Sequence, residues 1–173
     1  MKKLFVLMVA AVMSANVMAQ HEIGVVAGGL NGLSYKYWFS DRAALQTDLA
    51  VGLSYVPGAL YYSGNKLGDF NQSIYDFTVN PNLLYHFPLA DMFQLYVGGG
   101  VNLGMMSDIQ NTDPNGILGK FGVNAAVGFA VPIDKVVIAF DVRPGYGLGF
   151  QDADAGHLSF FDWKLGLAVR YSL

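Results

Sequence analysis

The last eleven residues of the chain, WKLGLAVRYSL, alternate strictly between two kinds of side chain. Large apolar residues stand at every odd position from 163 to 173, and Lys, Gly, Ala, Arg and Ser stand at the even positions. A period of two places the two sets on opposite faces of a β-strand. The pattern therefore predicts a C-terminal strand with one wholly apolar face.

The same alternation recurs upstream, most clearly over residues 44–55, 119–131 and 136–148. A soluble antiparallel sandwich also alternates, but its polar face is solvated and rich in Lys and Glu. Here the second face consists mainly of Gly, Ala, Ser and Asn with a few charges. Small side chains of this kind are typical of a narrow, enclosed interior.

Composition favours a chain whose outer surface does not face water. Hydrophobic residues make up 53% of the 173 residues and charged residues only 13%, about half of the charge that a soluble domain carries. The length suits a single domain. The absence of Cys excludes a disulfide framework, a thiol nucleophile and a thiolate metal site.

The N-terminus has the features of an export signal. Met1-Lys2-Lys3 precedes an apolar run over 4–13, and Val17-Met18-Ala19 suits cleavage before Gln20. We expect residues 1–19 to be a cleaved signal peptide and residues 20–173 to be the mature domain. No later stretch has the pattern of a membrane helix, so an exported, apolar chain of this kind predicts a closed β-barrel.

Turn signals divide the mature domain into eight expected strands. Short turns fall at 40–42, 88–91 and 132–134, longer loops at 56–72, 107–118 and 149–156, and a tight break at 29–32. An even number of strands places both termini beside the short turns, the side that bacterial barrels turn to the periplasm. We predict an all-β, eight-stranded antiparallel up-and-down transmembrane β-barrel in the cell outer membrane, with strands at 22–29, 33–39, 44–55, 73–87, 93–105, 119–131, 136–148 and 158–173.

Aromatic residues of the apolar set gather near the two ends of the expected strands. Amphipathic rings prefer the headgroup level of a membrane, so two belts indicate two membrane interfaces. The belt beside the short turns contains Tyr37, Phe39, Tyr85, Phe87, Phe93, Phe129 and Tyr171. The belt beside the longer loops contains Tyr55, Tyr75, Phe121, Tyr146 and Phe161.

The inward faces carry five acidic and five basic residues. An eight-stranded barrel is only wide enough for its side chains to fill it, and unpaired charges in such a space are costly. We therefore expect a plugged, salt-bridged lumen without an open pore, formed by Glu22, Asp48, Asp76, Asp141, Asp162, Lys36, Lys120, Arg143, Lys164 and Arg170. Without Lys2 and Lys3, the 10 basic residues fall to 8 against 13 acidic ones, so the net charge falls from −3 to −5; the excess negative charge lies in loops and turns.

Few residues of the sequence suggest a catalytic or ligand-binding site. His157 and Ser159 are expected on the outer face near the long loops, and this His-x-Ser pair resembles that of lipid A deacylases, which are eight-stranded barrels. A hydrolase also needs an acid to orient the His, and Glu22 lies at the opposite end; a chance spacing explains the pair more simply. The glycines of GGGVNLG lack the following helix of a phosphate loop. We expect no catalytic residue, no metal site and no cofactor.

Two segments resemble a known family. NPNLLYHF (80–87) followed by FQLYVGGGVNLG (93–104) is similar to the central hairpin of the small outer-membrane β-barrel superfamily of OmpW- and OmpX-type proteins. The C-terminal strand resembles the signal that the outer-membrane assembly machinery recognises, with Lys164, Gly166, Val169, Tyr171 and Leu173 at its positions. The family pattern prefers Phe at the last position, where this chain has Leu173.

The resemblance implies outer-membrane lipids, lipopolysaccharide and the barrel assembly machinery as partners, with an extracellular partner left open. The absence of a basic stripe argues against nucleic acid. We expect a non-enzymatic barrel with a structural or interaction role through its extracellular loops. Two alternatives are porin-like passage of small apolar solutes with lateral exit, and a deacylase-like hydrolase that uses His157 and Ser159.

Overall fold

The computed structural model describes residues 21–62, 65–90, 92–107, 117–150 and 157–173; for 53–57, 60–62, 70–74, 90, 157 and 158 only the backbone is considered. The expected signal peptide and parts of the expected loops lie outside these residues. Within the described part, no helix has the length and apolar character needed to cross a membrane.

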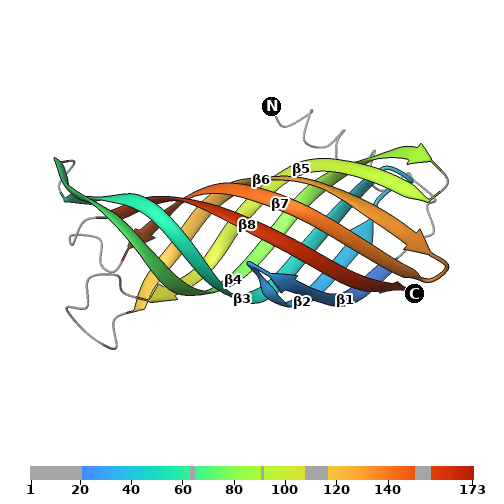
Figure 1. The fold of residues 1–173 in the computed structure, drawn as a ribbon, viewed down its shortest axis with the longest axis horizontal. Helices are drawn as coiled ribbons and strands as arrows, with labels where there is room; N and C mark the ends of the chain where they lie inside the picture. The colour runs from blue at the N-terminus through green and yellow to red at the C-terminus, as the bar shows by residue number, and fades with distance from the viewer. Residues whose placement is uncertain (1–20, 63–64, 91, 108–116, 151–156) are drawn as a thin grey trace, which may run out of the picture.

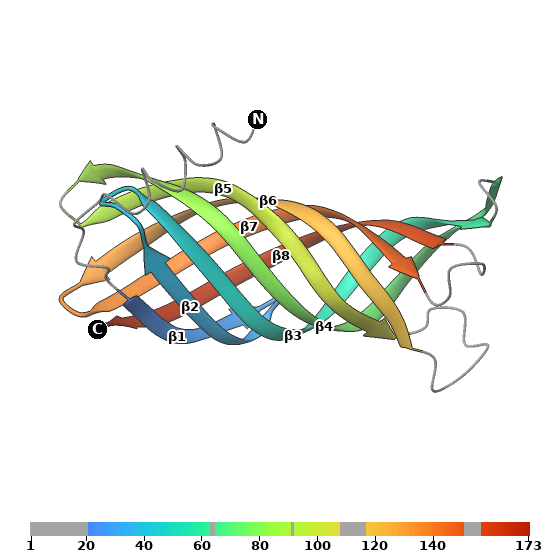
Figure 2. The ribbon, with the colours of Figure 1, turned by 180° about the vertical axis from the view of Figure 1, so that it is seen from behind.

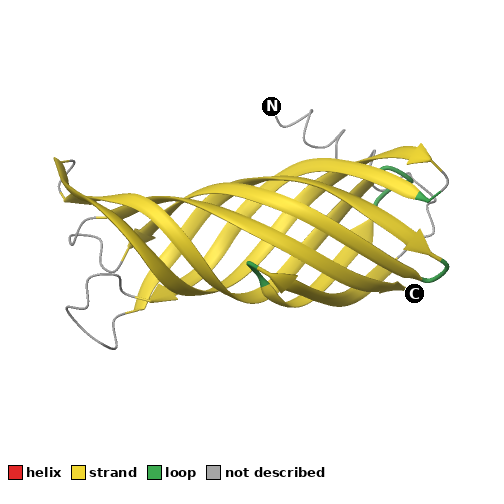
Figure 3. Cartoon of the chain, in the orientation of Figure 1, coloured by secondary structure: helices red, strands yellow, loops and turns green. Residues whose placement is uncertain are grey.

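Eight antiparallel strands form a closed ring in chain order, with β1 pairing with β8 (Figures 1 and 3). The all-β, eight-stranded up-and-down barrel is therefore confirmed. The strands are β1 (His21–Gly28), β2 (Asn31–Trp38), β3 (Ala43–Tyr62), β4 (Asn65–Ala90), β5 (Phe93–Ser107), β6 (Ile117–Ile133), β7 (Val136–Phe150) and β8 (His157–Ser172).

Burial follows the predicted alternation. In β6, residues 121, 123, 125, 127 and 129 are exposed, whereas 120, 122, 126, 128 and 130 are buried. In β7 the exposed set is even-numbered and the buried set odd-numbered, as the sequence indicates. The outer wall is consequently a band of exposed aliphatic and aromatic side chains, and the small and charged side chains point inward.

The expected loop at 56–72 is wrong. Those residues extend β3 and β4 into a long hairpin that projects beyond the other strands, at the end opposite the C-terminus (Figures 1 and 2). Pro57 and Gly58 resemble turn signals, yet Pro57 lies opposite Asn71 in a continuous ladder. Long-range pairing supplies the backbone hydrogen bonds and overrides the local preference.

The β1–β2 hairpin is short. Along the barrel axis its tip stops well before the end of the barrel that bears the long hairpin (Figure 1). Beyond this tip β3 pairs directly with β8, with Gly58 opposite Phe160 and Tyr61 opposite His157. The wall therefore contains eight strands near the C-terminus and six strands, β3 to β8, at the other end. We call these the turn end and the loop end.

Asn31 closes the tip of the short hairpin. Its side chain accepts a hydrogen bond from the Gly28 amide and donates one to the Gly28 carbonyl, at 3.2 and 2.9 Å. Gly28 has a φ of 120°, a conformation that L side chains rarely adopt. The Gly29 amide donates to the Leu165 carbonyl at 2.7 Å. These contacts satisfy backbone groups that lipid cannot.

Candidate functional site: the charged barrel interior

All ten charged residues assigned inward from the sequence are buried, none with more than 4% of its surface exposed. The barrel distributes them along its axis into three groups with different partners. We call them the loop-end quartet (Asp76, Lys120, Asp162 and Lys164), the central triad (Asp48, Asp141 and Arg143) and the turn-end cluster (Glu22, Lys36, Arg170 and the uncharged neighbour His86).

The loop-end quartet is a ring of alternating charges. Asp76 Oδ2 accepts hydrogen bonds from Lys120 Nζ at 2.5 Å and from Lys164 Nζ at 2.8 Å. Asp162 lies 3.4 and 3.6 Å from the same two ammonium groups. Two carboxylates therefore neutralise two lysines that come from β6 and β8, and the group carries no net charge.

Phe160 is buried in the interior beside the quartet. Its side chain is 1% exposed, and Lys120 Nζ lies 5.2 Å from the ring centroid. Gly147 makes room for the ring, because a Cβ there would lie 2.6 Å from Phe160 Cζ. An aromatic ring and four charged side chains thus lie together in the interior toward the loop end.

The central triad holds one cation between two anions. The Arg143 guanidinium donates to Asp48 Oδ2 and, through Nε and Nη2, to both Asp141 oxygens at 2.9 and 2.8 Å. The Tyr96 hydroxyl also donates to Asp141, at 2.9 Å. Arg143 lies opposite Lys164 in the β7–β8 register, but its ion pairs are with Asp141 on its own strand and, across the lumen, with Asp48 on β3.

The turn-end cluster is less completely paired. Arg170 Nε donates to Ser34 Oγ at 2.9 Å, while its Nη1 lies 3.8 Å from Glu22 Oε2. Lys36 Nζ lies 3.5 Å from His86 Nε2 and has no carboxylate within 4.0 Å among the described residues. Within that part of the chain, Glu22 Oε2, His86 Nδ1 and both Arg170 Nη atoms are buried without a hydrogen-bond partner.

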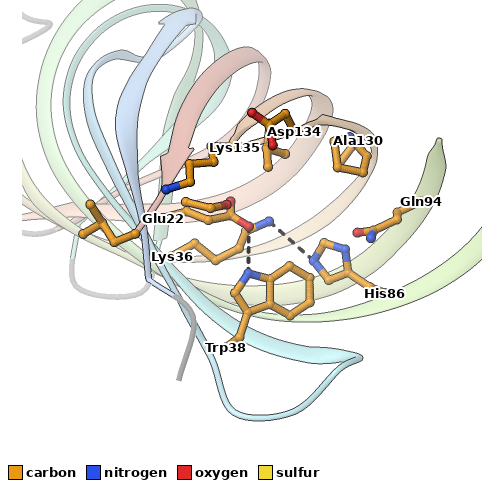
Figure 4. Close-up of a pocket in the computed structure, with 12 residues that line it drawn as sticks. Glu22, Lys36, Trp38, His86, Gln94, Ala130, Asp134 and Lys135 are labelled. Carbon is orange, nitrogen blue, oxygen red and sulfur yellow. Dashed lines mark hydrogen bonds between the residues drawn. The ribbon is translucent and has the colours of Figure 1, made fainter. Parts of the chain in front are cut away.

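A pocket of about 370 Å³ opens beside this cluster at the turn end (Figure 4). Lys36, Trp38 and His86 lie together on one side of it, and Asp134 and Lys135 lie across from them. The Trp38 indole N–H donates to Glu22 Oε1 at 2.7 Å, which fixes the ring in the wall of the pocket.

The interior also contains four aromatic residues that were not predicted from the sequence as part of the site: Tyr96, His86, Trp38 and Phe160. Each stands at an even-numbered position in a strand whose odd positions carry the outward apolar set. An aromatic residue on the polar face was the available signal for all four.

Ser159 is not on an open lipid-facing surface, so the exposure expected for it is wrong. It is 7% exposed, and its hydroxyl donates to the Ala59 carbonyl at 3.3 Å. The reason is the unexpected pairing of β3 with β8, which encloses this part of β8 between β3 and β7. The side chain of His157 lies outside what the structure describes. Among the described residues no group of His, Cys, Asp or Glu is arranged to hold a metal ion.

The expected aromatic belts lie on the outer wall where they are described. Tyr85, Phe87, Phe93, Phe129 and Tyr171 are exposed near the turn end, with Tyr37 and Phe39 half-buried beside them. Tyr75, Phe121, Tyr146 and Phe161 are exposed toward the loop end, and the Tyr55 side chain is outside the described set.

The outer wall also contains an apolar groove of about 620 Å³ where the short hairpin ends. It runs from Asn31 and Val51 across Tyr75 and Phe77 to Met105. Exposed aromatic and aliphatic side chains of β3, β4 and β5 form its sides.

The residues of the proposed assembly signal divide between the two faces of β8. Lys164 and Gly166 point into the interior, whereas Val169, Tyr171 and Leu173 are exposed.

Neither a protein-family model nor a curated protein sequence matches the chain. Solved structures of the same fold do. Neisserial surface protein A matches with a TM-score of 0.53 at 13% identity, over 88% of this chain and 93% of that one. A major outer membrane protein from Thermus thermophilus matches with a TM-score of 0.53 at 15% identity, over 91% and 100%.

The N-terminal β-barrel domain of Pseudomonas aeruginosa OprF matches with a TM-score of 0.50 at 18% identity, over 90% of this chain and 96% of that one. These likenesses establish the fold. They agree with the architecture implied by the family resemblance, and neighbours of this fold are bacterial outer-membrane proteins, in keeping with the predicted location.

Proposed function

We propose that this chain, which has the fold of the small outer-membrane β-barrels, is a non-enzymatic membrane protein with a sealed interior and an interaction role at its loop end. The observation that carries the sealed interior is the loop-end quartet. Asp76, Lys120 and Lys164 meet within 2.5–2.8 Å across the six-stranded part of the barrel. Ion-paired side chains that already contact one another leave no path for hydrated ions.

Recordings from planar lipid bilayers test the seal. The chain is expected to insert without a stable conductance step. The triple variant Asp76→Ala/Lys120→Ala/Lys164→Ala removes the cross-lumen contacts and is expected to leak ions if it inserts. Unboiled gel migration establishes that each barrel is folded. A large, stable conductance from the unmodified chain would contradict the proposal.

The interaction role rests on the β3–β4 hairpin. The hairpin extends past the rest of the wall (Figure 2), and residues 65–69 at its end are exposed. Their Lys66–Asp69 ion pair of 2.6 Å is solvated on both sides. A projecting, solvated hairpin contributes little to barrel closure and presents a contact surface beyond the lipid headgroups.

Shortening this hairpin tests the assignment. Replacing residues 60–69 by Asn-Gly is expected to leave insertion and heat-modifiable migration unchanged, because of the barrel pairings only the last two between β3 and β8, at Leu60 and Tyr61, are lost. Loss of the folded band would show that the hairpin serves folding and not contact.

Passage of small apolar solutes with lateral exit is a second candidate, favoured by the apolar groove beside Asn31 and Val51. Gly52 and the buried residue Asp76 also line the groove, so the groove reaches the inner layer of the wall. If solutes leave here, Val51→Trp, which fills the groove from its exposed side, is expected to slow the entry of an apolar dye into vesicles that contain the barrel. Equal rates for the variant and the parent would remove this candidate.

We also propose that β8 acts as the assembly signal, with the exposed Val169, Tyr171 and Leu173 presented to the assembly machinery while Lys164 and Gly166 face inward. Leu173→Phe is expected to increase the folded fraction in cells, since the family pattern has Phe there.

Outer-membrane lipids and lipopolysaccharide are the partners that we propose for the two aromatic belts of the outer wall.

A further inference from the structure

The pocket at the turn end contains a buried lysine that forms no ion pair with an acid among the described residues. Lys36 is 0% exposed, and its ammonium lies over the rings of Trp38 and Tyr96, at 5.2 and 5.3 Å from their centroids. Its nearest polar contact is His86 Nε2 at 3.5 Å. Aromatic faces attract a cation, but they leave room for an anion that approaches from the pocket.

The local charge favours such an anion. Within the turn-end cluster, Lys36 and Arg170 carry two positive charges against the single carboxylate of Glu22. On the far rim Asp134 and Lys135 offset each other (Figure 4). The loop-end quartet is neutral within itself and the central triad carries one net negative charge, since Asp48 and Asp141 face only Arg143. The excess positive charge of the interior is therefore confined to the turn end.

Glu22 does not occupy the position that a ligand would take. Its Oε1 accepts the hydrogen bond of the Trp38 indole at 2.7 Å, and its Oε2 lies toward Arg170 at 3.8 Å. His86 Nδ1 is buried without a partner among the described residues, although His86 lines the pocket. The pocket therefore contains an ammonium group that no carboxylate of the described residues contacts.

Part of the remaining surface of the pocket is apolar, and Gln94 and Ser172 add neutral polar groups. Trp38, Ala130, Pro132 and Val137 contribute to its lining. Its volume of about 370 Å³ lies within the range of small-molecule sites, roughly 300–1,000 Å³. A ligand that complements both parts has one negative group and an apolar body.

We propose that this pocket binds a small organic carboxylate that enters from the turn end. The carboxylate pairs with the Lys36 ammonium, and the apolar body packs against the fixed Trp38 indole. Charge-assisted hydrogen bonds are the stronger class, so the negative charge of the ligand provides most of the selectivity. The site lies at the opposite end of the barrel from the sealed loop end and does not depend on it.

Tryptophan fluorescence measures this binding directly, because the chain has two tryptophans and only Trp38 lines the pocket. Trp163→Phe removes the lipid-facing ring, which is 62% exposed, and leaves Trp38 as the reporter. The protein in phospholipid vesicles is titrated with benzoate, with benzyl alcohol as the neutral analogue of similar size, and with inorganic phosphate. We expect a saturable change with benzoate, and affinities at least about tenfold weaker for the other two. Equal affinity for benzoate and benzyl alcohol, or for benzoate and phosphate, would overturn the proposal.

Variants locate the site. Lys36→Met is expected to reduce benzoate affinity at least about tenfold, whereas the rim control Lys135→Met retains it to within about threefold. Gln94→Glu is a nearly isosteric change in the lining that supplies an internal carboxylate, and it is expected to abolish binding. Unboiled gel migration identifies the folded variants. If Lys36→Met does not fold, Gln94→Glu decides, and benzoate affinity unchanged in that variant contradicts the proposal.

Discussion

Lys120 and Lys36 are both buried lysines on the inner wall of the barrel, yet their surroundings are opposite. Lys120 contacts Asp76 at 2.5 Å and Asp162 at 3.4 Å in a neutral group. Lys36 contacts two aromatic faces and a histidine beside a pocket. The difference shows that charge balance over the whole interior does not imply pairing at each site.

The two regions also differ in the wall that surrounds them. The loop-end quartet lies toward the part where six strands form the wall, beside the buried ring of Phe160. The turn-end cluster lies where all eight strands are present and beside a pocket. The charges of the first region contact one another, whereas the second contains a lysine that no carboxylate of the described residues contacts.

Asp76→Ala is expected to have the largest effect on stability. The change removes the carboxylate shared by Lys120 and Lys164, so two buried ammonium groups depend on Asp162 alone. Loss of one partner from a buried ion pair costs about 3–5 kcal/mol. Urea unfolding of the barrel in phospholipid vesicles measures this cost. A loss below about 1 kcal/mol would show that the quartet does not hold the interior together.

Ser34→Ala tests the turn-end cluster at its arginine. It removes the hydroxyl that accepts from Arg170 Nε at 2.9 Å and leaves that guanidinium only the distant Glu22. A buried donor without a partner costs about 1–3 kcal/mol, and the same unfolding experiment measures it. A loss as large as that of Asp76→Ala would mean that the two regions are equally dependent on their pairs.

Gln94→Glu is expected to be neutral or stabilising by up to about 1 kcal/mol, because its carboxylate faces the positive turn-end cluster. Asn124→Asp is the matched control in the barrel interior. Asn124 donates to Asn82 Oδ1 at 2.6 Å, and an aspartate would replace that donor with a second acceptor. Destabilisation by both changes would contradict the excess positive charge that we assign to the turn end.

Asp69→Ala is expected to have the smallest effect. The Lys66–Asp69 pair in the projecting hairpin is exposed on both sides, and solvated pairs of this kind contribute little. No measurable change in unfolding is expected. A clear loss would mean that the hairpin belongs to the cooperative unit of the barrel.

The barrel itself could be predicted from the sequence because a period of two is a local property. Each strand reveals its inward face without knowledge of its partners, and this placed all ten interior charges on the correct side. The β3–β4 hairpin could not be predicted in this way. Pro57 and Gly58 are turn residues by composition, and only the pairing of β3 with β4 and with β8 makes the segment extended.

The ion-pair partners of the interior charges could also not be predicted from the sequence. Lys120 on β6 reaches Asp76 on β4, and Arg143 on β7 reaches Asp48 on β3. Such contacts cross the lumen. They depend on the stagger of every pair of neighbouring strands, which together determine which residues face each other across the barrel. The burial of Ser159 has the same origin, since it follows from the β3–β8 pairing.

The same substitution at the two contrasted lysines tests the account most directly. Lys120→Met and Lys36→Met are compared by urea unfolding in vesicles of one composition. We predict that Lys120→Met lowers the free energy of unfolding by about 3 kcal/mol, because Asp76 and Asp162 then share Lys164. Lys36→Met is predicted to change it by less than about 1 kcal/mol, because no acid loses a contact partner. Equal losses, or a larger loss at Lys36, would contradict the distinction between a paired loop end and an unpaired turn end.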